Sequence, residues 1–95
     1  MNAATLSFST DELAILKHVT RHAASRPLAG LARLEHALTM IKPGKPFHFS
    51  AREIEAADEA FQLAPDLGIA PDTLKVGSSD AFHRVKATIA AARVD

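Results

Sequence analysis

The chain of 95 residues contains no cysteine, tryptophan or tyrosine, and only five phenylalanines. The absence of cysteine excludes disulfides, thiolate nucleophiles and cysteine-type zinc sites. No stretch approaches the roughly 18 consecutive apolar residues that a membrane-spanning helix needs. The N-terminus also lacks the basic region followed by an apolar run that marks a secretory signal. We therefore expect a cytoplasmic protein that makes no contact with a membrane.

An excess of charge of one sign is missing too, because eleven basic residues balance eleven acidic ones. The chain therefore has no overall attraction to nucleic acid or to an anionic surface. Residues 1–46 carry six basic and three acidic side chains, a net charge of +3, and residues 47–95 carry five and eight, a net charge of −3. This split could orient the two halves, or two chains head to tail, although ordinary scatter explains it as well.

What the sequence does contain is a helix-start signature that occurs twice. Ser9 and Ser50 are each preceded by phenylalanine and followed three residues later by glutamate, at Glu12 and Glu53. In such a capping box the serine hydroxyl accepts a hydrogen bond from the glutamate amide, and the glutamate side chain accepts one from the serine amide. The pattern predicts two helix N-termini of the same chemistry, each with the preceding phenylalanine as a hydrophobic staple.

Apolar side chains at helical spacing predict four helices in one domain over residues 1–95. The predicted helices cover residues 10–24, 27–41, 51–64 and 80–93, the last with Ser79 as its N-cap. Residues 47–49 should be extended, and residues 71–75 should form a short helical turn. The fold class is therefore all-α, a small four-helix domain.

The doubled capping box raises the hypothesis that the domain consists of two pseudo-repeated helical hairpins. Hairpin one would cover about residues 9–41 and hairpin two about residues 50–94. Their apolar faces would then bury each other. The alternative is that amphipathic helices resemble one another by necessity.

Two histidines, His18 and His22, lie four residues apart and therefore project from one face of the first helix. Two imidazoles at this spacing can hold a divalent metal, but the sequence fixes no third ligand. The pair lies away from the apolar stripe, so two exposed histidines are the simpler interpretation. We predict no metal site.

Motifs of common enzyme classes are also missing. The chain has no glycine-rich phosphate loop, no His-Glu-x-x-His and no serine in an elbow motif. A cluster of carboxylates at Glu53, Glu55, Asp58 and Glu59 could supply paired acids and bases, but charges on the outer face of an amphipathic helix are far commoner. We therefore predict no enzyme, no catalytic residue and no cofactor.

Protein–protein contact is the function that remains after these exclusions. The narrow apolar seams of the second and fourth helices offer surface that another protein, or a second copy of the chain, could cover. A homodimer is the simplest such assembly. The residues predicted to make this contact are Leu31, Leu34, Leu38, Ile41, Phe82, Val85 and Ile89.

A second hypothesis comes from the segment 67–76, which reads Leu-Gly-Ile-Ala-Pro-Asp-Thr-Leu-Lys-Val. It resembles the turn and second helix of LuxR-type helix-turn-helix regulators, whose pattern is Leu-Gly-Ile-x-Pro-x-Thr-Val-Lys. The resemblance implies a DNA-binding transcriptional regulator that uses about residues 64–76, with Thr73 and Lys75 on a helix for the major groove. The sequence departs from the pattern at Pro65, and the net negative charge of this half opposes phosphate contacts.

Overall fold

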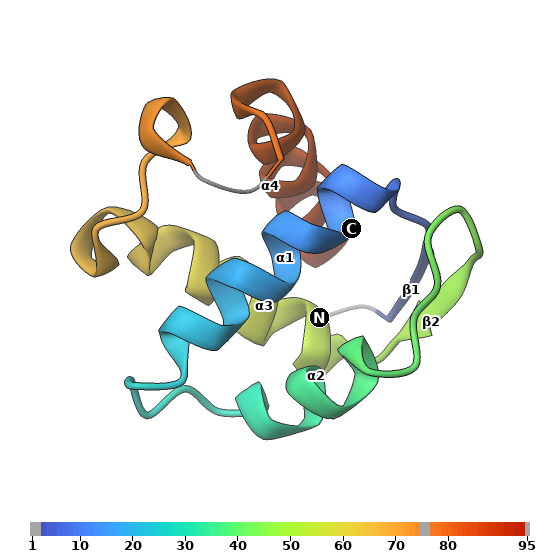
Figure 1. Ribbon diagram of the computed structural model, residues 1–95. Coiled ribbons are helices and arrows are strands. Elements are labelled where there is room, and N and C mark those ends of the chain that lie inside the picture. Colours follow the sequence, from blue (N-terminus) through green and yellow to red (C-terminus); the bar gives the residue numbers. More distant parts are fainter. Residues whose placement is uncertain (1–2, 75–76, 95) are drawn as a thin grey trace.

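The computed structural model describes residues 3–74 and 77–94. Its α-helices are α1 (Thr10–Ala23), α2 (Leu31–Leu38), α3 (Ala51–Leu63) and α4 (Ser79–Val94). Helices α1 and α3 cross at the centre of the molecule, with α2 below and α4 above in the view of Figure 1. Among the described residues, α1 and α3 each pack against the other three helices. The remaining elements are strands β1 (Ala4–Leu6) and β2 (Phe47–Phe49) and the 3-10 helices η1 (Ala64–Leu67) and η2 (Pro71–Thr73).

Both predicted capping boxes are confirmed, at the N-termini of α1 and α3. The Ser9 amide donates to Glu12 Oε1 at 2.8 Å, and the Glu12 amide donates to Ser9 Oγ at 3.2 Å. The corresponding distances for Ser50 and Glu53 are 2.7 and 3.2 Å. Both preceding phenylalanines are buried, and their rings meet edge to face with centroids 6.1 Å apart. The two helix starts are therefore joined through their phenylalanines.

The prediction of an all-α fold is wrong in one respect, because strands β1 and β2 form a small antiparallel sheet. Thr5 lies opposite His48, and Thr5 Oγ1 and His48 Nδ1 are 3.3 Å apart. The extended conformation of residues 47–49 was predicted, but its partner strand was not. A strand of three residues is too short to show the alternation of apolar and polar side chains by which strands are recognised.

The second helix is shorter at both ends than the predicted range of 27–41. Gly30 precedes α2 with a φ of +80°, which interrupts helical geometry before Leu31. A Cβ atom at this position would lie 3.0 Å from the backbone oxygen of Arg52, so the glycine also permits a close approach to α3. At the other end, the Met40 amide donates to Ala37 O at 2.9 Å, a tighter turn that closes the helix.

The N-cap of the fourth helix is Ser78 and not the predicted Ser79. The Ala81 amide donates to Ser78 Oγ at 3.2 Å, and the Phe82 amide donates to the Ser78 carbonyl at 3.0 Å. Ser79 is instead the first helical residue. The two adjacent serines are equally good caps by composition, so only the backbone path distinguishes them.

Nothing in the described fold supports two repeated hairpins. Helices α1 and α3 have similar lengths of 14 and 13 residues, but α2 has 8 residues and α4 has 16. The repeat therefore stays a hypothesis that rests on the two capping boxes. Among the described residues, no helix is both long enough and apolar enough to cross a membrane.

Candidate functional site

The seven residues predicted to contact a partner all lie in the core of a single chain. Their side chains are between 0% and 6% exposed, and they are Leu31, Leu34, Leu38, Ile41, Phe82, Val85 and Ile89. The sequence pattern identified apolar faces correctly, but the other helices of the same chain cover those faces. A surface offered to a partner must therefore be made of other residues.

The segment that resembles a helix-turn-helix motif folds differently from such a motif. Helix α3 ends at Leu63, η1 follows, and Gly68 then adopts a left-handed conformation with a φ of +77°. The predicted groove-binding helix is reduced to the three residues of η2, which ends at Thr73, and Leu74 is already extended. Lys75 and Val76 lie outside the described residues. The described part of the segment therefore provides no helix that could enter a major groove.

The histidine pair on α1 is close together, with ring centroids of His18 and His22 4.2 Å apart. Because a carbonyl oxygen can only accept, the 2.9 Å contact between His22 Nδ1 and the His18 carbonyl places a proton on Nδ1. Burial lowers the pKa of His18, and the nearby His22 and Arg21 lower it further. The described residues contain no group of three or more side chains that could hold a metal ion.

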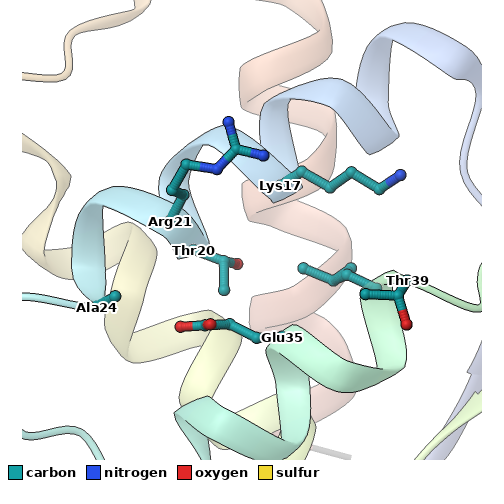
Figure 2. A pocket seen from close by; sticks show the side chains of 7 residues that line it. Lys17, Thr20, Arg21, Ala24, Glu35 and Thr39 are labelled. Atoms are coloured by element: carbon teal, nitrogen blue, oxygen red, sulfur yellow. The ribbon is translucent and has the colours of Figure 1, made fainter.

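A cavity of about 310 Å³ lies between α1 and α2 (Figure 2). Its walls come from side chains of both helices and of the residue that caps the C-terminus of each. The lining residues are Lys17, Thr20, Arg21, Ala24, Glu35, Leu38 and Thr39. We call this space the α1–α2 cavity.

The rim of the α1–α2 cavity carries charges of both signs on opposite walls. Lys17 and Arg21 lie four residues apart on α1, so they belong to the same face of that helix. Glu35 extends from α2 on the other side (Figure 2). All three side chains are exposed, and none of them forms an ion pair with another described residue. Their charges are therefore available to a bound molecule.

The floor of the cavity contains a buried hydroxyl group. Thr20 is 1% exposed, and its Oγ1 has no hydrogen-bond partner among the described residues. A buried polar group without a partner costs about 1–3 kcal/mol, and native proteins contain few of them. The Thr39 hydroxyl, by contrast, donates to the His36 carbonyl at 2.6 Å. Thr20 is therefore the one described side chain whose buried polar atom lacks a partner.

Sequence reasoning did not identify this site, although one signal was present. Thr20 follows Leu16 by four residues and precedes Ala23 by three, so it lies on the apolar face of α1. A hydroxyl-bearing residue on a face that packs against other helices needs a partner. The opposition of Lys17 and Arg21 to Glu35 depends on how α2 packs, and no spacing within the chain predicts it.

Comparisons of the chain with protein-family models, with curated proteins and with solved structures found no match. Functional inference therefore rests on the chain's own residues. The arrangement at the α1–α2 cavity combines cations, a carboxylate and hydroxyls around a small apolar floor. Such a set can bind a polar molecule.

Proposed function

We propose that this chain is a non-enzymatic protein that acts through protein–protein contacts, and that it associates with a second copy of itself. The proposed contact surface, which we call the α1–α2 face, consists of Lys17, Arg21, Glu35, Thr39 and Met40. All five side chains are exposed. Met40 directly follows Thr39 in the chain and, at 54%, is the one large apolar side chain that is exposed in the described part of the chain. Methionine is common at contact surfaces because its flexible side chain adapts to different neighbours.

The observation that carries the proposal is the presence of both charge signs on one face. In a dimer with twofold symmetry the same patch meets itself, so a group that lies away from the symmetry axis faces a different group on the other protomer. Lys17 or Arg21 of one protomer could then pair with Glu35 of its partner, and the symmetry would repeat the pair. A patch of a single sign would repel itself in the same arrangement.

Static light scattering after size exclusion, over a wide range of protein concentration, tests self-association. We expect the mean mass to rise towards that of a dimer as concentration increases. Arg21→Glu and Glu35→Arg should each weaken the dimer, by about 2- to 30-fold for two symmetry-related surface ion pairs. The double variant with both changes should restore association, because it exchanges the two signs.

The control is Arg33→Glu, which reverses another exposed charge of α2 that does not line the cavity. It should leave the dimer unchanged. A monomer at every concentration would overturn self-association. If neither Arg21→Glu nor Glu35→Arg weakens the dimer, the two chains contact each other through another face.

A further inference from the structure

We propose that the α1–α2 cavity binds a small zwitterion, an α-amino acid with an aliphatic side chain. The proposal concerns the cavity of one chain and does not need the dimer. Because Arg21 and Glu35 also belong to the proposed α1–α2 face, leucine and a second copy of the chain would compete for them. A volume of about 310 Å³ lies at the lower end of small-molecule sites, which span roughly 300–1,000 Å³. The size therefore fits a compact ligand.

The charges on the two walls match the two ends of an amino acid. The guanidinium of Arg21 is suited to a carboxylate because its N–H groups can donate two parallel hydrogen bonds, and Lys17 adds a second cation on the same wall. Glu35 on the opposite wall can accept hydrogen bonds from an ammonium group. A ligand with only one charge would leave one wall without a partner.

The floor of the cavity supports the same ligand class. Leu38 is 4% exposed and, with Ala24, provides an apolar surface for an aliphatic side chain. Thr20 also lines the cavity, and its Oγ1 is buried (Figure 2). A bound carboxylate would supply the hydrogen-bond partner that the described residues do not give to Thr20 Oγ1.

The test is a titration of the protein with leucine, followed by two-dimensional NMR of the backbone amides. Two further probes each lack one charged end: 3-methylbutylamine has no carboxylate, and 4-methylpentanoate has no amine. We expect leucine to shift amides of α1 and α2 saturably. Each of the other two probes loses a hydrogen bond to a charged group, so each should bind about 10- to 100-fold more weakly than leucine.

Three variants assign the contacts within the site. Arg21→Gln should weaken the binding of leucine more than the binding of 3-methylbutylamine, which has no carboxylate. Glu35→Gln should weaken the binding of leucine more than the binding of 4-methylpentanoate, which has no amine. Thr20→Val keeps the shape of the side chain and removes its hydroxyl, so leucine should bind about 10-fold more weakly. Arg33→Gln is the control, because Arg33 is exposed on α2 and does not line the cavity.

Absence of saturable shifts up to the solubility limit of leucine would overturn the proposal. Equal binding of leucine and either single-charge probe would do the same, because one wall would then be unused. Light scattering of the same samples reports the oligomeric state separately. Leucine binding by a chain that stays monomeric at every concentration, with and without leucine, would support this inference while contradicting self-association. A dimer that does not bind leucine would give the opposite result.

Discussion

Arg84 on α4 donates from Nε to Oε2 of Glu12 at 3.2 Å, while Oε1 of the same carboxylate accepts from the Ser9 amide at 2.8 Å. The glutamate that completes the capping box of α1 therefore also joins α1 to α4, across 72 residues of sequence. Glu53 completes the second capping box in the same way, but no described cation forms an ion pair with it. The two boxes thus share their local chemistry and differ in their tertiary role.

Replacement of Glu12 by glutamine should lower the free energy of unfolding at neutral pH. In the acid range, the stability of the variant should depend less on pH than that of the wild type. The Ser9 amide is the main cause of a lowered pKa for Glu12, and the Ser9 hydroxyl and Arg84 add to it. The native state therefore favours the charged form, so this contribution is present above the ordinary pKa of 4.5 and is lost as the pH falls through the lower folded value.

Urea unfolding at a series of pH values from neutral into the acid range checks this prediction. The stability difference between the wild type and Glu12→Gln should shrink as the pH falls. Asp66→Asn is the control, because Asp66 is exposed, forms no ion pair among the described residues and lies outside the α1–α2 face. A difference that stays constant with pH would mean that the charge of Glu12 does not stabilise the fold.

Ser78→Ala should destabilise the protein, while Ser79→Ala should have almost no effect. Only Ser78 accepts from the Ala81 amide, and loss of an N-cap hydroxyl costs about 0.5–2 kcal/mol. Ser79 occupies the first helical position, where alanine is a good helix former. Chemical denaturation of the two variants compares them directly, and equal losses would show that either serine can cap α4.

Gly77→Ala should cost more stability than Gly44→Ala, although both glycines have a positive φ, of +68° and +75°. A left-handed backbone costs a residue with a side chain about 1–2 kcal/mol at either position. At Gly77 a Cβ atom would also lie 2.5 Å from Cδ1 of Ile15, whose side chain is fully buried. At Gly44 it would meet no described atom within 4 Å.

Overpacking of this kind adds about 1–3 kcal/mol, so Gly77→Ala should be the worse variant by that amount. The measurement is the urea midpoint of each variant under the same conditions. If Ile15→Val partly rescues Gly77→Ala, the contact with Ile15 is the cause. Equal midpoints for the two alanine variants would instead mean that Ile15 moves aside at no cost.

The helices could be predicted from the sequence because their signals are local. Each capping box depends on residues three positions apart, and each apolar face depends on spacings of three and four. Both boxes and the burial of Leu34 and Val85 follow from these patterns. Helix ends were harder to predict. Gly30 precedes α2 with a left-handed φ of +80°, and a Cβ atom there would lie 3.0 Å from the backbone oxygen of Arg52, a contact that no local pattern indicates.

The sheet and the cavity could not be predicted, because both depend on which distant segments meet. Strand β1 is stabilised by pairing with β2, more than forty residues away. The cavity likewise exists because α2 packs against α1 and leaves Glu35 opposite Arg21. Amphipathic patterns indicate that a face is buried, but they do not distinguish burial within the chain from burial by a partner. For this reason Leu31 and Phe82 were predicted as contact residues.

Stability should fall more steeply below neutral pH in the wild type than in His18→Gln. Burial is the main cause of the lowered pKa of His18, and His22 and Arg21 add repulsion. The unfolded state therefore binds a proton first as the pH falls below the ordinary value of 6.5, and stability declines until the folded value is passed. Thermal unfolding across this range measures the slope. An unchanged slope in His18→Gln would assign the pH dependence to other groups.

Thr20→Val should raise the stability of the ligand-free protein. The valine keeps the shape of the threonine side chain and removes a buried hydroxyl that has no partner among the described residues. Relief from an unsatisfied buried group is worth about 1–3 kcal/mol, so the midpoint of urea unfolding should increase. Most substitutions in a protein core lower stability instead.

Thr39→Val provides the matched control for this prediction. The Thr39 hydroxyl donates to the His36 carbonyl at 2.6 Å, so its removal should lower stability slightly, by about 0.5–1.5 kcal/mol. If Thr20→Val also lowers stability, the Thr20 hydroxyl already has a partner, such as a bound water, in the free protein. A gain in stability together with weaker leucine binding would show that the hydroxyl is kept for a ligand at the expense of the fold.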